Sequence, residues 1–474
     1  MPTTTDICII GGGPAGCVLG ARLAQFGMDV CLVERAEFPR RHLGESLSPG
    51  VSALLASIGA GPAIEAAGYP RVRKVSVHWE VEREREEPDG QGMLVDRGHF
   101  DRLLLEHARA CGVRVLQPAT LEKLERRAGA WSVAVWAEGR MTNLEVRLMA
   151  DASGRAGVLP RCRRRTEPLT VALYAYGTGN GLPEHPRIQA GAAAWYWGVP
   201  LPDGLYNTLV FLDPRDLRAM RGTHTAKFHE LITASSLLPS GASASLVGRV
   251  QVVDATPYLD EECVTEDSIK VGDAALALDP ISSSGVQKAI QSALAGSAVV
   301  NTLLRRPQAQ ALARQFYREN LSEASTRHRA WARGHYAQVA ASRKARFWRE
   351  RAKATTLPEL APPGAEATVP PDLTLRLSPG VEIVELPCVV DRFIEARPAV
   401  CHLSLAAPVA YLGEVELAPL LRCVRSGMTT RDLARSWMPR VPPRTGMAIA
   451  QWLVSRSLLV PLADARPAKE GSGA

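Results

Sequence analysis

A glycine-rich segment near the start of the chain constrains the fold more than any other feature. It reads GGGPAG, and patterns typical of a strand, a helix and a second strand surround it at residues 6–12, 14–27 and 29–35. The spacing GxGxxG within it is made by Gly11, Gly13 and Gly16. A strand, a glycine turn and a helix in this order predict a β-α-β unit that binds a dinucleotide.

The chemistry of each position explains the pattern. Gly11 permits a tight turn, Gly13 lets the backbone approach a pyrophosphate, and Gly16 lets the helix pack close to the sheet. The N-terminal end of the helix then faces the phosphates, and Glu34, at the end of the second strand, would accept a hydrogen bond from a ribose hydroxyl. Two neighbours complete the predicted cofactor site in this region: Ala15 and Arg35.

The rest of the chain predicts an α/β protein whose nucleotide-binding domain is interrupted by a second domain. One long stretch is largely strand-like, after which a strand, a Gly-Asp turn and a long helix return the chain to the first domain. A Pro- and Ala-rich stretch without periodicity indicates a linker, and three short helices ending in a strand suggest a winged-helix-like module. The predicted boundaries are 1–167 and 263–355 for the Rossmann-type domain, 168–262 for the β-sheet substrate domain, 356–375 for the linker and 376–474 for the C-terminal domain.

Cysteine usage and hydropathy argue against a metal site and against a membrane protein. The nine cysteines have neither CxxC nor Cys/His ligand spacing, which favours buried free thiols over disulfides, and no metal is predicted. The chain has no apolar run of about eighteen residues and no basic, cleavable N-terminal segment. We therefore expect a cytoplasmic protein without membrane contact.

The formal net charge of +7 is concentrated in two arginine-rich stretches, residues 161–165 and 342–353. Such runs are usually solvated faces, and the alternative is a docking surface for an acidic partner. No nucleic-acid recognition motif accompanies them, so no nucleic-acid partner is predicted.

Three further segments indicate which dinucleotide is bound. FPRRHLGESLSPG occupies residues 38–50, VDRGHFDRLL occupies residues 95–104, and GDAALALDPISSSGV occupies residues 272–286. Together with the glycine turn they resemble the FAD-binding framework of aromatic-hydroxylase-type flavoproteins. GESLSP and the stretch AAWYWGVPL are similar to the flavin-dependent halogenase branch, a family of halogenase-like FAD monooxygenases. Its WxWxxP signature is matched by Trp195, Trp197 and Pro200.

The resemblance implies how FAD would be held. Asp273 would accept a hydrogen bond from a ribityl or ribose hydroxyl, and backbone donors near Gly285 and Val286 would face the pyrimidine edge of the flavin. Pro280 belongs to the loop before that helix. The resemblance implies contacts with the phosphates or the ribityl chain for Arg41, Ser46 and Arg97. For Arg41 and Arg97, the alternative is a structural role in turns and salt bridges of the fold.

The resemblance also implies oxygen chemistry with O2 as co-substrate. In this family reduced flavin gives a C4a-hydroperoxide, which decays if water reaches it. Trp195 and Trp197 share one face of a strand and would separate the flavin from the substrate chamber, whereas a place in the core is the alternative for both. The chain has no second nucleotide-binding fingerprint, so electrons would come from transiently bound NAD(P)H or from a separate flavin reductase.

A halogenase also needs a lysine, and Lys74 lies near the position where the family carries it. Lys74 could instead be one of several basic strand residues, since Arg71 and Arg73 are its neighbours. The family's halide signature, Phe-x-Pro-x-Ser-x-x-Gly, departs here because Leu278 replaces the Phe. Three histidines near the framework could assist proton transfer or be structural: His42, His78 and His99.

The C-terminal pattern is similar to small winged-helix modules that bind leader peptides, and a cap or dimerisation domain is the alternative. We therefore expect an FAD-dependent monooxygenase that hydroxylates an aromatic residue, tryptophan first, of a peptide or small protein docked on the C-terminal module and the basic surface. The sequence resembles the branch that hydroxylates a peptidyl tryptophan during tryptophylquinone maturation of quinohemoprotein amine dehydrogenase. A peptidyl-tryptophan halogenase that uses Lys74 and an isoprenoid-reductase-type flavoprotein are the alternatives.

Overall fold

The computed structural model describes residues 3–40, 42–79, 85–127, 129–353, 370 and 372–462, with only the backbone of residues 85–91 and 243. Its contacts divide the chain into two compact units. Unit 1 contains residues 1–355 and 391–393, and unit 2 contains residues 356–390 and 394–474. Most of the predicted linker at 356–375 lies outside the described residues.

The first sheet of unit 1 contains the predicted β-α-β unit. Strand β1 (Thr3–Ile10) pairs in parallel with β2 (Val30–Val33) on one side and with β9 (Arg140–Asp151) on the other. Helix α1 (Pro14–Gln25) connects β1 to β2 and begins with a proline, whose missing N–H costs nothing in the first turn. The strand order is β6-β2-β1-β9-β8-β7, with β17 beside β9. The remaining strands are β6 (Arg114–Leu116), β7 (Ala119–Arg127), β8 (Ala130–Ala137) and β17 (Ser268–Lys270).

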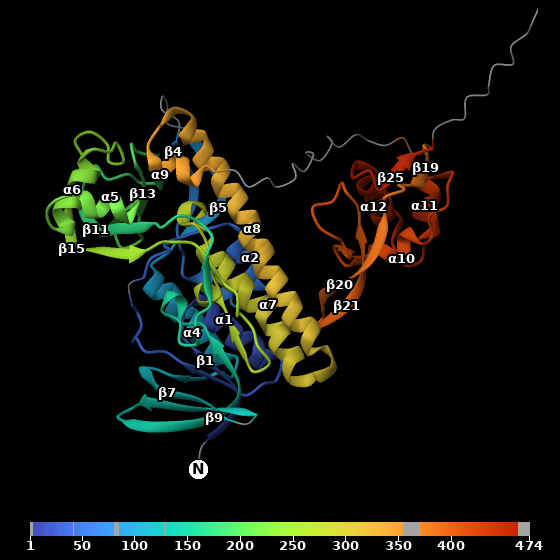
Figure 1. Cartoon of the computed structure of the whole chain (residues 1–474), viewed down its shortest axis with the longest axis horizontal. Coiled ribbons are helices and arrows are strands. Elements are labelled where there is room, and N and C mark those ends of the chain that lie inside the picture. Colours follow the sequence, from blue (N-terminus) through green and yellow to red (C-terminus); the bar gives the residue numbers. More distant parts are fainter. Residues whose placement is uncertain are drawn as a thin grey trace, which may run out of the picture. The chain divides into compact units, whose positions relative to one another are not determined.

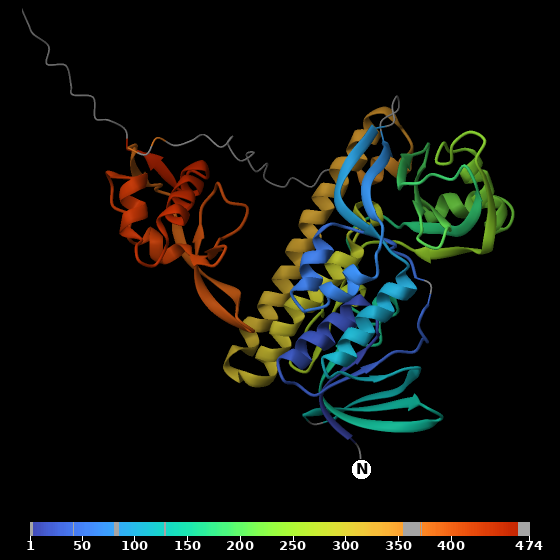
Figure 2. The same ribbon diagram turned by 180° about the vertical axis from the view of Figure 1, so that it is seen from behind.

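Three helices that are far apart in the sequence pack side by side near this sheet. Helix α1 contacts both α4 (Arg97–Ala110) and α7 (Gly285–Arg305), and α2 (Gly50–Ala56) contacts α7 (Figure 2). Asp96 caps α4 by accepting hydrogen bonds from the backbone N–H groups of Gly98 and His99. The short helix α3 (Gly61–Ala66) lies between α2 and β4 in the chain.

The second sheet has eight strands in the order β15-β11-β14-β13-β12-β4-β5-β3. It joins strands from residues 171–254 to three strands that precede residue 168, so it is larger than the predicted sheet domain at 168–262. Strand β12 makes this connection by pairing in parallel with β4. The strands are β3 (Ser46–Leu47), β4 (Arg71–His78), β5 (Arg85–Leu94), β11 (Val171–Asn180), β12 (Arg187–Ala190), β13 (Ala194–Pro200), β14 (Tyr206–Leu212) and β15 (Ser243–Asp254).

Helices cover both faces of the second sheet. Helices α5 (Pro214–Ala219) and α6 (His224–Thr233) pack on the face that carries Tyr196. The long helix α8 (Gln310–Ser342) and α9 (Arg346–Arg351) pack on the face that carries Trp195. Figure 1 shows α8 running along unit 1 toward α9 and the second sheet. A third sheet has the order β10-β16-β18, formed by β10 (Arg163–Arg165), β16 (Tyr258–Asp260) and β18 (Leu276–Ala277).

Unit 2 contains the three short helices and the final strand that the sequence predicts. Trp437 and Leu433 lie in its apolar core. Thr429 is the N-cap of α11 and forms a capping box with Asp432. Its antiparallel sheet has the order β24-β19-β25, and β20 and β21 form a two-stranded ribbon. The elements are β19 (Thr374–Leu377), β20 (Glu382–Val390), β21 (Phe393–Cys401), β22 (Tyr411–Leu412), β23 (Val415–Glu416), α10 (Leu417–Leu421), β24 (Met428–Thr429), α11 (Thr430–Ser436), α12 (Pro443–Ser455) and β25 (Leu459–Pro461).

The cysteines are free thiols, as predicted, but burial holds for only part of the set. Cys8, Cys17, Cys31 and Cys263 are buried, whereas Cys162 and Cys423 are exposed. Within the described part of the chain, no helix combines the length and the apolarity that crossing a membrane requires.

Candidate active site

The glycine turn between β1 and α1 leaves backbone exposed to a ligand at one position and packs tightly at two others. A Cβ atom on Gly11, whose φ is +111°, would lie 2.4 Å from the carbonyl oxygen of Ala152. A Cβ atom on Gly16 would lie 1.9 Å from the carbonyl oxygen of Gly11. At Gly13 the nearest atom would be 4.0 Å away, in the Arg40 side chain. The cradle therefore fits a pyrophosphate that approaches at Gly13 beside the α1 N-terminus.

The Glu34 side chain connects the end of β2 to this turn by hydrogen bonds. Its carboxylate is buried and accepts hydrogen bonds from the backbone N–H groups of Gly12 at 2.6 Å and Ala36 at 2.7 Å. The guanidinium of Arg40 lies 3.9 Å from the same carboxylate and 3.8 Å from that of Asp101. Arg40 is thus the arginine beside the predicted ribose-binding acid.

The predicted arginines occupy different surroundings. Arg97 is buried, and its guanidinium donates to both carboxylate oxygens of Asp101 and to the carbonyl oxygen of Leu43. A Cβ atom on Gly44 would lie 2.7 Å from Arg97, so the loop passes directly over this guanidinium. Arg35 is exposed, and Arg41 lies outside the described residues.

Asp273 follows β17 and lies beside two cations. Its carboxylate accepts from the Lys288 ammonium at 2.8 Å and lies 3.9 Å from the guanidinium of Arg155. Enclosure by the chain raises the pKa of Asp273, but Lys288 and Arg155 together outweigh that effect, so the pKa lies below its ordinary value. An ionised carboxylate here suits hydrogen bonding to a sugar hydroxyl.

The loop from Pro280 to Ser284 leads into α7. Ser283 has φ +51° in this loop, and Gly285 and Val286 begin the helix. Ser48 also reaches this region by donating to the side-chain oxygen of Gln287. The start of α7 and the segment at residues 42–50 are therefore in direct contact.

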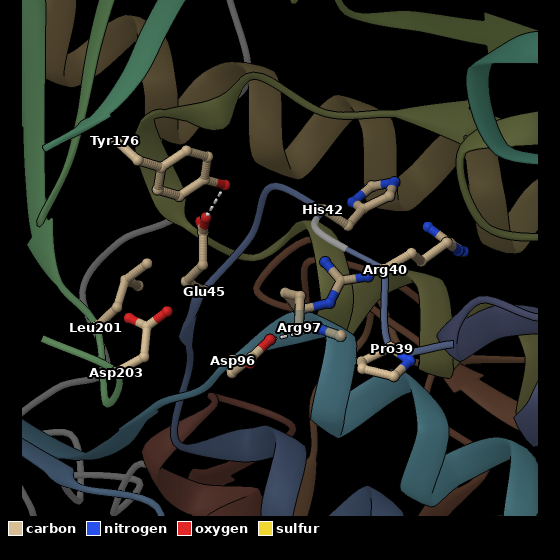
Figure 3. Close-up of a pocket in the computed structure, with 10 residues that line it drawn as sticks. Pro39, Arg40, His42, Glu45, Asp96, Arg97, Tyr176, Leu201 and Asp203 are labelled. Atoms are coloured by element: carbon tan, nitrogen blue, oxygen red, sulfur yellow. Dashed lines mark hydrogen bonds between the residues drawn. The ribbon is translucent and has the colours of Figure 1, made fainter. Parts of the chain in front are cut away.

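A pocket opens between this cofactor region and the second sheet. One side is formed by Arg40, His42 and Arg97, and the other by Tyr176, Leu201 and Asp203 (Figure 3). Glu45 projects between the two sides, and the hydroxyl of Tyr176 points at it.

Glu45 is the centre of a buried polar cluster. One carboxylate oxygen accepts from the Tyr176 hydroxyl at 2.8 Å and from the amide nitrogen of Asn207 at 3.0 Å. The other accepts from the backbone N–H of Gly44 at 2.9 Å. Burial raises the pKa of Glu45, and the hydrogen bond from Tyr176 and the charge of Arg97 offset only part of that rise. No sequence pattern singled out Glu45, although it is next to Ser46 in the chain.

The two signature tryptophans share one face of β13 but differ in burial. Trp195 is 2% exposed and stacks on Phe211 with ring centroids 3.8 Å apart. Trp197 is partly exposed on the same face. Leu43 and Ile281, from the two loops around the predicted flavin site, pack against this apolar cluster. The apolar cluster of the two tryptophans therefore extends to both of these loops.

Asp279 and Tyr336 form a second buried polar contact near these rings. Asp279 accepts from the Tyr336 hydroxyl at 3.0 and 3.1 Å, and burial raises the pKa of its carboxyl to about 6. Leu278, the departure from the halide signature, is next to it in the chain. Lys74 is exposed on β4 and is not among the residues that line the pocket in Figure 3.

Comparison with known families decides the class. A model described as tryptophan halogenase matches residues 90–362, and a model described as FAD binding domain matches residues 4–163. The chain belongs to the tryptophan halogenase family. Members of this family are flavin-dependent enzymes, and the glycine cradle at Gly13 fits the FAD that the matched domain binds.

Relatives of this halogenase-family chain support the assignment. The tryptophan 2-halogenase of Chondromyces crocatus is 31% identical over 340 residues, which cover 67% of this chain and 65% of that enzyme. The 1H-pyrrole-2-carbonyl-[peptidyl-carrier protein] chlorinase of Pseudomonas fluorescens is 28% identical over 61% of this chain and 74% of its own length. The chain thus spans slightly less than two thirds of the first of these relatives.

Two solved structures match the halogenase-family chain along nearly its full length. The flavin-dependent halogenase CmlS has a TM-score of 0.79 at 20% identity, covering 97% of this chain and 96% of its own, and it establishes the fold. The peptidyl tryptophan dihydroxylase QhpG, described as essential for tryptophylquinone cofactor biogenesis, has a TM-score of 0.72 at 26% identity. That match covers 96% of this chain and all of the other.

Proposed function

We propose that this protein is an FAD-dependent monooxygenase that hydroxylates an aromatic residue, tryptophan first, of a peptide or protein, in the biogenesis of a quinone cofactor. The observation that carries the proposal is the match to the peptidyl tryptophan dihydroxylase, which is 26% identical and extends over 96% of this chain. The halogenase CmlS covers as much of the chain at 20% identity, and the halogenase CndH covers 76% of it at 25% identity. An enzyme that modifies a residue of a polypeptide needs a place for that polypeptide, and unit 2 would supply it.

The chain's own residues would bind and orient FAD and keep its reacting edge dry. The Gly13 backbone and the α1 N-terminus would hold the pyrophosphate, Glu34 a ribose hydroxyl, and Asp273 a hydroxyl of the ribityl chain or ribose. When bound, reduced FAD supplies the activated oxygen from O2. Trp195 and Trp197, packed with Leu43 and Ile281, would exclude water from the space between flavin and substrate.

Peptidyl-tryptophan halogenation is the second candidate, because the family model and the sequence relatives are halogenases. It requires Lys74 to position the halogenating species. The exposure of Lys74 on β4 and the Leu278 replacement favour the oxygenase. A reductase acting on an isoprenoid is a third candidate, distinguished by turnover without oxygen.

The partners are also proposals. The polypeptide substrate would dock on unit 2 and on the basic stretches at residues 161–165 and 342–353, and electrons would come from NAD(P)H or from a separate flavin reductase. Of the basic residues, Arg164 and Arg165 are exposed, and so is Arg349. Arg165 and Arg349 would face acidic side chains of a partner, whereas the guanidinium of Arg164 already lies 2.6 Å from the Glu261 carboxylate.

The test is halide dependence. The FAD-loaded protein is reduced, mixed with a tryptophan-containing peptide and O2, and the peptide mass is followed with and without chloride or bromide. The oxygenase adds oxygen at the same rate in both buffers, and Lys74→Ala retains that activity. Product that needs halide and disappears in Lys74→Ala would replace the proposal with the halogenase, provided that the variant still binds FAD.

A further inference from the structure

The inner face of the second sheet changes from aromatic to polar along three neighbouring strands. At one end Trp195 and Ala172 stand opposite Phe211. Two residues along, Trp197 and Tyr174 stand opposite Leu209. Because side chains two residues apart point to the same face, these two rows continue into a third.

The third row is polar. Tyr176 and Val199 stand opposite Asn207. The side chains of Tyr176 and Asn207 both donate hydrogen bonds to the Glu45 carboxylate. Tyr174 and Tyr176 contact each other edge to face with ring centroids 6.0 Å apart, so the aromatic and polar rows adjoin. Glu45 and Tyr176 also line the pocket that opens toward the cofactor region (Figure 3).

Two oxygen atoms in this third row retain acceptor capacity. The side-chain oxygen of Asn207 is buried and has no hydrogen-bond partner among the described residues. The second carboxylate oxygen of Glu45 accepts from the backbone N–H of Gly44 at 2.9 Å, and a carboxylate oxygen can accept two hydrogen bonds. Buried acceptors left unpaired cost free energy, so this arrangement is completed by a donor.

We propose that Glu45, assisted by Asn207, accepts a hydrogen bond from the indole N–H of the substrate, whose ring lies against Trp197 and Tyr174. This inference rests on the proposed function and names the group that selects its substrate. The site and the indole are complementary, because an aromatic surface that ends in two acceptors fits a flat ring that carries a single donor at its edge. An arene without a donor would leave buried acceptors unpaired, which is how such a site rejects it.

The experiment compares binding of two peptides to the oxidised, FAD-loaded protein. One contains tryptophan, and the other contains 3-benzothienylalanine, in which sulfur replaces the indole N–H with little change in shape. Hydrogen bonds to charged groups lead us to expect about 10- to 100-fold tighter binding of the tryptophan peptide by the wild type. In Glu45→Gln an amide NH2 replaces one acceptor oxygen, and the ratio of the two dissociation constants should fall close to one.

Two variants separate recognition from support of the loop. Tyr176→Phe removes the donor that ties Glu45 to β11 but keeps the carboxylate, so it should retain most of the preference for tryptophan. Glu37→Gln changes an exposed acid of a nearby loop and should bind both peptides as the wild type does. The flavin absorbance spectrum of each variant reports whether FAD remains bound in the same environment.

The outcomes are distinct. If the wild type binds neither peptide and modifies no tryptophan, the proposed function fails and this inference fails with it. If the wild type modifies the tryptophan peptide but binds both peptides equally, the inference alone is overturned, whether or not Glu45→Gln folds. Equal loss of preference in Glu45→Gln and Tyr176→Phe would assign Glu45 to holding the loop. If the flavin spectrum shifts only in Glu45→Gln and the preference for the tryptophan peptide is retained, Glu45 contacts FAD and the inference is overturned.

Discussion

The glycine turn and the Glu45 cluster lie in the same unit but are held by different interactions. At the turn, backbone atoms approach so closely that a single added carbon at Gly11 or Gly16 would overlap them. At Glu45, a buried carboxylate is held by side chains that stand 131 and 162 residues away in the chain. The first region tolerates no added volume, whereas the second depends on its polar partners. Under our proposals, cofactor binding depends on backbone geometry and substrate selection on side-chain chemistry.

The largest effect is expected at the turn. Gly16→Ala places a Cβ atom 1.9 Å from the carbonyl oxygen of Gly11, so the turn must move and FAD binding should be lost. Gly20→Ala in the same helix meets only side-chain atoms at 3.4 Å and gains about 1 kcal/mol of helix propensity. FAD retained after purification and the thermal midpoint of each variant measure the effect. Equal FAD content in both variants would show that backbone packing does not limit this region.

The next largest effects are expected when the side chains of Trp195 and Trp197 are truncated. Trp195→Ala removes a buried ring stacked on Phe211 and should cost about 3–5 kcal/mol of unfolding free energy. Trp197→Ala removes a partly exposed ring and should cost about 1–2 kcal/mol. Both should raise the hydrogen peroxide released per reduced flavin oxidised, because the wall is opened. Unchanged peroxide release in Trp197→Ala would assign that residue to packing alone.

The buried carboxyl of Asp279 should make the unfolding free energy depend on pH. Burial raises its pKa to about 6, above the value of about 3.9 for an unfolded Asp, so the folded state binds more protons between these values. Stability contributed by the protonated form is therefore lost as pH rises from about 4 to about 6. Over that window the unfolding free energy of the wild type should fall by up to about 3 kcal/mol relative to Asp279→Asn. Urea titrations at several pH values measure it, and parallel curves for the two proteins would contradict the assignment.

The smallest effect is expected at a local feature of unit 2. Thr429→Ala removes the side chain that accepts from the backbone N–H of Asp432 and should destabilise α11 by about 1 kcal/mol. Thr429→Ser keeps the hydroxyl and is the matched control. Chemical denaturation of the full chain, followed by a probe of Trp437, measures the difference. Similar losses in both variants would show that the methyl group, and not the cap, stabilises this helix start.

The sequence predicted features whose causes are local. The β-α-β unit and the short helices of unit 2 depend on residues a few positions apart, so spacing alone identifies them. The sequence pointed to Arg35, whereas Arg40 is the arginine that lies beside Glu34. The path of the loop after β2 decides this, and the sequence pattern does not reveal that path. Asn207 was missed because its contact with Glu45 exists only once the register of β11 and β14 is set. The extent of the second sheet was underestimated for the same reason, since a parallel pairing of β4 with β12 has no local signal.

The most direct test of the central claim is the origin of the atom added to the substrate. The reduced, FAD-loaded protein is given a tryptophan-containing peptide and 18O-labelled dioxygen in halide-free buffer, and the intact peptide mass is measured. The account predicts a product that carries one or two labelled oxygen atoms on the indole ring. A peptide that stays unmodified until chloride or bromide is added, and then carries halogen in place of oxygen, would contradict it.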